Sequence, residues 1–246
     1  MTEFPWMPIL MYHRIVEREP LSDPDGICTS VARFDAHLDW LASRSFLCVP
    51  VDLALRPARA GEGRRFAITF DDGYEETLRL ALPVLEARSL PATVFVVSGQ
   101  IGGRALWNHE PQKLLTRDEL LALQTAGIFI GSHGRTHRRL STLEDREIPD
   151  EVSRSRGELE QLLGAPVPFF SYPHHDFDER VLLSVRRTYS GGVGGRSGVH
   201  SVHNLHRIDA GRITLRQLAL HVYGIHRWAR RQALPTPLRR LAARAT

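Results

Sequence analysis

Two pairs of polar residues in this chain have the types and the spacing for chemistry on a metal ion. Asp71 and Asp72 are adjacent at the end of an apolar stretch, and neighbouring carboxylates repel unless a cation or a shared proton lies between them. His133 and His137 are four residues apart, a spacing at which both rings can reach one ion across a single helical turn. One carboxylate and two imidazoles leave positions open on the ion, which suits a catalytic divalent cation.

Each pair also has a simpler interpretation. Two aspartates at the end of a strand commonly cap the next helix or form a turn. A chain with 12 histidines can contain an HxxxH spacing by chance. If the pairs act together, one carboxylate binds the ion and the other is placed to accept a proton from water.

Strands and helices alternate along the chain and must position these residues. Short apolar segments predict strands, and amphipathic segments predict helices with caps at Ser30 and Thr116. Strands are expected at 7–12, 46–51, 64–70, 91–97, 127–132, 166–172, 189–193 and 205–208, and helices at 31–44, 75–88, 116–126, 144–163, 178–188 and 215–223. This alternation predicts an α/β fold with a parallel sheet or barrel.

Polar residues directly follow several of the predicted strands. They are His13, the aspartate pair, His133, and His174 with its neighbour His175. In α/β proteins the side chains beyond the carboxyl ends of the strands gather over the sheet or barrel. We therefore expect a single polar site at that end.

The sequence around these residues resembles three motifs of the polysaccharide deacetylases, a family of metal-dependent carbohydrate N-deacetylases. TFDDG (69–73) is similar to the first motif, GSHGRTHRRL (131–140) to the second and FFSYPHHDFDE (169–179) to the third. The resemblance implies that Asp71 is the general base. It also implies that the metal ligands are Asp72, His133 and His137.

The second and third motifs depart from the family pattern. Gly134 stands where the family usually has a hydroxyl residue, and His174 and His175 stand where an aromatic residue and a glycine are expected. The resemblance implies that the third-motif turn is kept. Tyr172 and His174 would then contact the substrate, with the His174 N–H as an oxyanion donor.

A general acid is also required, because the departing amine must receive a proton. ILMYHRI (9–15) resembles the start of the circularly permuted branch of poly-N-acetylglucosamine deacetylases, which implies that His13 is the acid. The simpler interpretation is a histidine that only ends a strand. NLHRID (204–209) is similar to the closing segment of that branch, which implies that Arg207 orients Asp71 and helps to bind substrate.

Length and composition agree with one catalytic domain. The 246 residues, 42% hydrophobic and 24% charged, fit a single globular α/β barrel. The resemblance implies a distorted (β/α) barrel of about seven strands, a single domain that we assign to residues 1–225. Cys28 and Cys48 lack a metal-binding spacing and are expected to be free, buried thiols.

The net charge of +4 comes from the end of the chain. Eight arginines follow the last acid, Asp209, so the preceding part carries −4. This gives no support for nucleic-acid binding. The basic tail, residues 226–246, could contact an anionic membrane surface, although a solvated end is the simpler interpretation.

The sequence contains no run of about 18–20 apolar residues and no signal-peptide pattern, so we expect a cytoplasmic enzyme. Its substrate would then be a small, lipid-linked or precursor N-acetylated sugar rather than an assembled polymer. Zinc is the expected metal, and nickel, cobalt or iron fit the same ligands. Two alternatives stay open: a catalytically inactive carbohydrate-binding barrel, and a deacetylase of an O-acetyl or non-sugar amide substrate.

Overall fold

The computed structural model describes residues 7–56, 61, 63–195 and 200–224. The chain divides into two units, Met1–Arg212 and Ile213–Thr246. The predicted basic tail, 226–246, lies outside the described residues. No helix within the described part of the chain is long and apolar enough to cross a bilayer.

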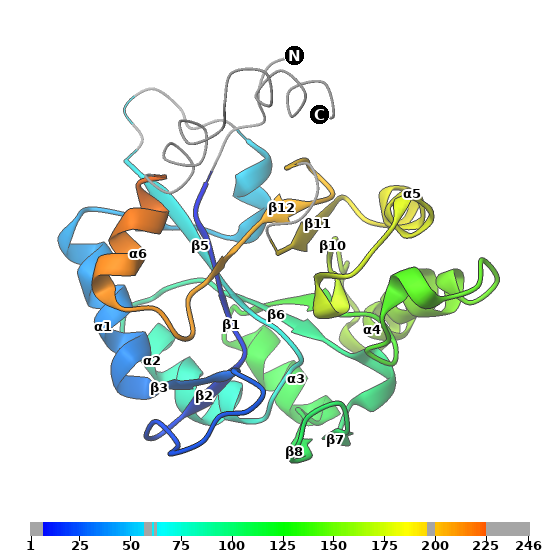
Figure 1. Cartoon of the computed structure of the whole chain (residues 1–246), viewed down its shortest axis with the longest axis horizontal. Coiled ribbons are helices and arrows are strands. Elements are labelled where there is room, and N and C mark those ends of the chain that lie inside the picture. The colour runs from blue at the N-terminus through cyan, green and yellow to red at the C-terminus, as the bar shows by residue number, and fades with distance from the viewer. Residues whose placement is uncertain (1–6, 57–60, 62, 196–199, 225–246) are drawn as a thin grey trace. The chain divides into compact units, whose positions relative to one another are not determined.

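Parallel strands form the centre of the first unit (Figure 1). Their order is β12-β11-β10-β9-β6-β5-β1-β13, and each pairing along it is parallel. Their bounds are β1 (Ile9–Tyr12), β5 (Arg65–Phe70), β6 (Thr93–Val96), β9 (Phe129–Ser132), β10 (Phe169–Ser171), β11 (Gly191–Gly194), β12 (Leu205–His206) and β13 (Ile208–Asp209).

The two strands at the ends of this order are separated by a single residue, Arg207. Leu205 of β12 pairs with β11, and Ile208 of β13 pairs with β1. The segment 205–209 therefore closes the sheet into a ring, and when it is counted as one strand the described ring has seven. The predicted α/β barrel is confirmed.

Shorter strands lie outside this ring. They are β2 (Arg14–Val16) and β3 (Cys28–Ser30), which pair in parallel, β4 (Leu47–Cys48), which pairs with β5, and β7 (Arg104–Ala105) and β8 (Gln112–Lys113), which are antiparallel. None of them except β4 was expected, because two or three residues carry no detectable hydrophobic period. Cys28 and Cys48 are free and buried, as predicted.

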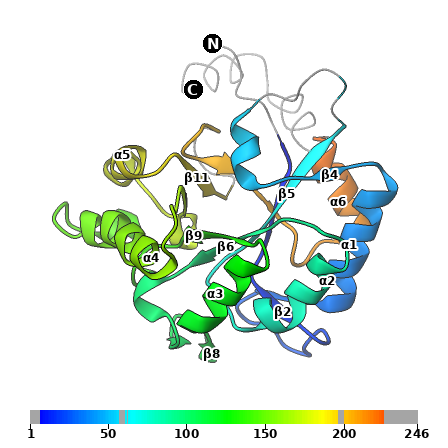
Figure 2. The ribbon, with the colours of Figure 1, turned by 180° about the vertical axis from the view of Figure 1, so that it is seen from behind.

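Five α-helices surround the strands in both views (Figures 1 and 2). They are α1 (Val31–Ser43), α2 (Leu82–Glu86), α3 (Arg117–Thr125), α4 (Ser155–Leu163) and α5 (Glu179–Thr188). The predicted caps are confirmed: the Ser30 side chain accepts from the Arg33 N–H, and Thr116 forms a capping box with Glu119. In the second unit, α6 (Leu215–Val222) begins at Thr214 with another capping box.

The described residues also form short 3₁₀-helical turns, which are tighter than an α-helix, and π-helical turns, which are wider. The 3₁₀ turns are η1 (Val51–Leu55), η3 (Ser98–Gln100), η4 (Leu140–Thr142) and η6 (Pro173–His175), and the π-helical turns are η2 (Thr77–Ala81) and η5 (Asp150–Arg154). Two helices expected to be continuous are therefore interrupted. Pro83 lies in the first turn of α2, and Pro149 directly precedes the π-helical turn η5. Proline cannot donate the backbone hydrogen bond of a regular α-helix.

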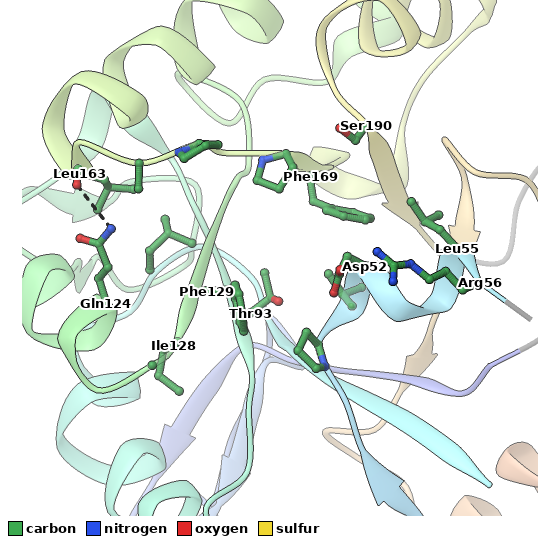
Figure 3. A pocket seen from close by; sticks show the side chains of 17 residues that line it. Asp52, Leu55, Arg56, Thr93, Gln124, Ile128, Phe129, Leu163, Phe169 and Ser190 are labelled. Atoms are coloured by element: carbon green, nitrogen blue, oxygen red, sulfur yellow. Dashed lines mark hydrogen bonds between the residues drawn. The ribbon is translucent and has the colours of Figure 1, made fainter. Parts of the chain in front are cut away.

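The two ends of the barrel differ in polarity. Apolar side chains pack together near the amino ends of the strands, among them Met7, Val51 and Phe169. An apolar cavity of about 620 Å³ lies at this end, where Thr93 and Phe129 begin their strands (Figure 3). The carboxylate and histidine residues of the sequence motifs lie at the other end.

Gly131 of β9 allows the barrel interior to close. A Cβ atom at this position would overlap the Phe95 ring and lie 3.2 Å from the Phe169 carbonyl oxygen. Gly131→Ala should therefore lower the free energy of unfolding by about 1–3 kcal/mol, the usual cost of overpacking. Gly157 of α4 has no neighbour within 4 Å of such a Cβ, so Gly157→Ala should raise stability by about 0.5–1 kcal/mol. Urea unfolding of both variants tests the packing, and equal shifts would contradict it.

Candidate metal and catalytic site

A polar cleft of about 230 Å³ lies at the carboxyl ends of the strands. Seven of the eight site residues predicted from the sequence line it, and Arg207 alone does not. The lining residues are His13, Asp25, Ile27, Asp71, Asp72, Trp107, Asn108, His133, His137, Tyr172, His174 and His175. The strand ends thus bring together residues that are far apart in the sequence.

Three side chains in the cleft converge on one point. The Nε2 atoms of His133 and His137 lie 3.2 Å and 3.1 Å from the Oδ1 atom of Asp72. All three residues are buried, and in the described part of the chain they are the one group of three whose ligand atoms all lie within 4.8 Å of one another. Ligands about 2.0–2.1 Å from a tetrahedral zinc ion are separated by about 3.3 Å, so the spacing fits a shared ion.

The hydrogen bonds around these residues also fit a cation. The Nδ1–H group of His133 donates to the Ser171 carbonyl oxygen at 2.9 Å, because a carbonyl can only accept. A neutral His133 therefore directs the lone pair of Nε2 toward the carboxylate of Asp72. Asp72 Oδ1 itself is buried without a hydrogen-bond partner. Two facing acceptors in a buried site need a proton or a metal ion between them.

The two histidines reach this point by a loop. The prediction of a single helical turn was wrong, because the backbone leaves β9 after Ser132 and reverses through Gly134, with φ +76°, and His137, with φ +62°. The carbonyl groups of Gly134 and Arg135 accept hydrogen bonds from the backbone N–H groups of Ser98 and Gly99. The two histidines of the HxxxH motif are thus brought together by a hydrogen-bonded turn and not by a helix.

Left-handed backbone is concentrated at this site. Six described residues other than glycine have positive φ, and four of them, Asp72, His137, His174 and His175, line the cleft. Such conformations are unfavourable for residues with a Cβ atom and persist only where surrounding contacts impose them. Their clustering here indicates that the fold holds the cleft in one geometry.

Asp71 forms a buried ion pair with Arg207. The guanidinium donates to Asp71 Oδ1 at 2.7 Å and to Oδ2 at 2.6 Å, and the side chains are 1% exposed or less. Arg207 also donates to the Gly194 carbonyl and to Ser171 Oγ. Burial alone would raise the pKa of Asp71, but the Arg207 charge outweighs it and holds that pKa well below its usual range. Asp71 therefore stays ionised.

Ser171 and Trp107 also support the site, and the sequence analysis missed both. The Ser171 hydroxyl donates to Asp71 Oδ2 at 3.2 Å, while its carbonyl fixes His133. Trp107 stacks on the His137 ring with 4.1 Å between centroids. Ser171 directly precedes the third-motif turn, a signal that could have identified it. Trp107 stands between two short strands, in a segment with no periodic pattern.

The third-motif turn forms another wall of the cleft. The Tyr172 hydroxyl donates to the His203 carbonyl at 2.7 Å, so this side chain presents an apolar ring. His174 Nε2 donates to the carbonyl of His137 at 3.2 Å. Burial, together with the charge of Arg207, lowers the pKa of His175 to about 4, so its ring is neutral near pH 7.

The fold and the cleft agree with the comparisons with known proteins. The family model for polysaccharide deacetylases matches residues 58–189, and the chain belongs to this family. The predicted enzyme class, a hydrolase that deacetylates carbohydrates, is thereby confirmed.

Individual relatives extend the similarity beyond the matched segment. The polysaccharide deacetylase homologue YxkH of Bacillus subtilis (strain 168) is 28% identical over 210 residues, which cover 82% of this chain and 70% of YxkH. The deacetylase PplD of Streptococcus pyogenes has a TM-score of 0.72 at 20% identity, covering 88% of this chain and 97% of its own. IcaB from Ammonifex degensii has a TM-score of 0.72 at 21% identity, covering 88% and 95%. These two structures share the fold.

Replacing Arg207 should leave the buried Asp71 carboxylate without a charged partner. Arg207→Met should lower the free energy of unfolding by about 3–5 kcal/mol near pH 7. Because the pKa of Asp71 is lowered in the folded wild type, the stability that the ion pair contributes should decline as the pH falls below about 4, where Asp71 of the unfolded chain is protonated first, and the deficit should shrink with it. Urea unfolding from pH 3 to 8 measures the deficit. A deficit independent of pH would contradict the role of this ion pair.

Proposed function

We propose that the protein removes the acetyl group from an N-acetylated sugar by metal-dependent hydrolysis. The observation that carries this proposal is the convergence of Asp72, His133 and His137 in the same cleft as Asp71, a second carboxylate held ionised by Arg207. A binding module needs neither a ligand set with open positions nor a buried, oriented base.

Asp72, His133 and His137 would hold the metal, and zinc suits these nitrogen and carboxylate ligands. When bound there, a divalent cation would acidify water and polarise the acetamide carbonyl group. The Nδ1–H bond from His133 to the Ser171 carbonyl orients the ring and fixes its tautomer, as the outer partners of metal-binding histidines commonly do.

Asp71 would accept the proton of the attacking water. Arg207 contacts both of its oxygens, so the carboxylate is fixed in orientation and remains deprotonated. His13, directly after β1, also lines the cleft and would protonate the departing amine. The His174 backbone N–H would stabilise the oxyanion. Arg207 would act on substrate only through Asp71.

The size of the cleft favours a small substrate or a single exposed sugar. Its volume of about 230 Å³ is below the roughly 300–1,000 Å³ typical of sites for drug-sized ligands. Trp107 closes it beside His137, and His174 and His175 occupy the third-motif wall. A precursor or lipid-linked N-acetyl sugar would fit this description. We also propose, from the sequence alone, that the enzyme acts in the cytoplasm.

The function is tested by acetate release from N-acetylglucosamine, its oligomers of increasing length and an O-acetylated sugar. We expect metal-dependent release of acetate and a free amine, with kcat/KM highest for the shortest substrates. Acetate release from the O-acetylated sugar alone would indicate an O-deacetylase in place of the proposed N-deacetylase. Binding without release from any of them would indicate an inactive carbohydrate-binding barrel.

Substitution of the two adjacent aspartates should have different effects on zinc binding and on turnover. Asp71→Asn should bind zinc like the wild type but lose about 10²–10⁴ in turnover, the usual contribution of a general base. Asp72→Asn should lose zinc affinity first, because it removes a ligand. Zinc content and turnover of both variants check the assignment. Equal zinc affinity in the two variants would reject it.

Substrates with different leaving groups can distinguish a general-acid role of His13 from a purely structural role. His13→Ala should keep its zinc and its melting temperature but lose about 10²-fold or more in amide hydrolysis. An activated aryl acetate should be affected much less, because its leaving group needs no proton. Proportional losses on both substrates would exclude His13 as the acid.

A further inference from the structure

The structure assigns a positioning role to Glu151, a buried carboxylate that touches none of the three metal-binding side chains in the contacts described. We propose that Glu151 fixes the loop between His133 and His137 and thereby sets the affinity of the site for its metal. This inference rests on the proposed metal site and extends it to a residue outside the sequence motifs.

Glu151 binds the backbone of this loop directly. Its Oε2 atom accepts the N–H groups of Arg135 and Thr136, both at 2.9 Å. Its Oε1 atom accepts the Thr136 hydroxyl. Two consecutive N–H groups form a natural seat for an anion, and bonds to an ionised acceptor are stronger than neutral ones. One carboxylate thus satisfies three donors of the three-residue connection between His133 and His137.

The surroundings leave Glu151 little freedom. The residue is 3% exposed and belongs to the π-helical turn η5, the kind of irregular turn often found at functional sites. The absence of a side chain at Gly134 makes room for it, since a Cβ atom there would lie 3.1 Å from Glu151 Oε2. The departure of Gly134 from the family pattern therefore coincides with the position of this carboxylate.

The loop is held from its other side as well. The backbone N–H groups of Ser98 and Gly99 donate to the carbonyls of Gly134 and Arg135 at 3.1 Å and 2.9 Å. The carbonyl oxygens are therefore fixed from η3, and the N–H groups are fixed from η5. His137 follows directly, in the left-handed conformation that it would not adopt without such restraint. Loss of the Glu151 carboxylate would remove the hydrogen bonds that hold the N–H groups of the loop, while those to its carbonyl groups would remain.

The experiment compares Glu151→Ala with a control on the same helical stretch. Glu158→Ala removes a carboxylate that binds the side chains of Arg135 and Ser98 but not the loop backbone. The dissociation constant for Zn²⁺ is measured by competition with a chromogenic chelator, using the full chain. Hydrogen exchange of the segment 133–137 is followed in the metal-free proteins.

We expect Glu151→Ala to raise the Zn²⁺ dissociation constant about 10–100-fold and to speed exchange in the segment, while Glu158→Ala changes the constant less than about 3-fold. Glu151→Gln, whose amide oxygen can still accept both N–H groups, should fall between wild type and Glu151→Ala. A purely structural role predicts a lower melting temperature of the metal-free protein with an unchanged zinc constant, and that result overturns the proposal.

Two further outcomes are informative. If Glu151→Ala does not fold, Glu151→Gln is used to test the proposal. A Zn²⁺ dissociation constant raised at least about 3-fold in this variant supports the proposal, and an unchanged dissociation constant overturns it. If wild type itself fails to bind Zn²⁺, the metal site is wrong. Accelerated exchange in Glu151→Ala would then still show that the carboxylate holds the loop.

Discussion

The buried ion pair between Arg207 and Asp71 is the interaction on which the rest of the site depends. Arg207 occupies the one-residue gap between the strand that pairs with β11 and the strand that pairs with β1. Its guanidinium therefore points into the ring at the place where the ring closes. The residue that lies where the ring closes thus also neutralises the carboxylate at the centre of the site.

Ser171 links this ion pair to the candidate metal ligands. Its hydroxyl contacts both Asp71 and Arg207, and its carbonyl accepts from His133. The base and the ligand set are thus parts of one hydrogen-bonded network that spans β5, β9 and β10. Because Ser171 bonds to both, the positions of the base and of the ligand His133 are fixed against the same residue.

The sequence predicted the barrel and the residues at its strand ends because both depend on short-range patterns. The strands expected at 7–12 and 64–70 are apolar over most of their length, and a residue that follows such a strand must lie at its carboxyl end. The loops obey no such period. The contacts of Trp107 with His137 and of Glu151 with the histidine loop depend on segments packed from elsewhere in the chain, and the left-handed turn at His137 replaces the helix that the spacing suggested.

Closure of the ring by the segment 205–209 has a consequence for synthesis of the protein. Asp71 and Arg207 are separated by 136 positions in the chain, and ribosomes add about 5–20 residues per second. For a time on the order of ten seconds, the nascent chain therefore carries its central carboxylate without the cation that neutralises it. The first strand waits longer still for its last neighbour, because the paired residues Leu10 and Ile208 lie 198 positions apart, and such distant pairings are slow to form. Until almost all of the first unit has been made, the nascent barrel remains an open sheet in which both β1 and β11 are unpaired edges, and exposed strand edges favour aggregation.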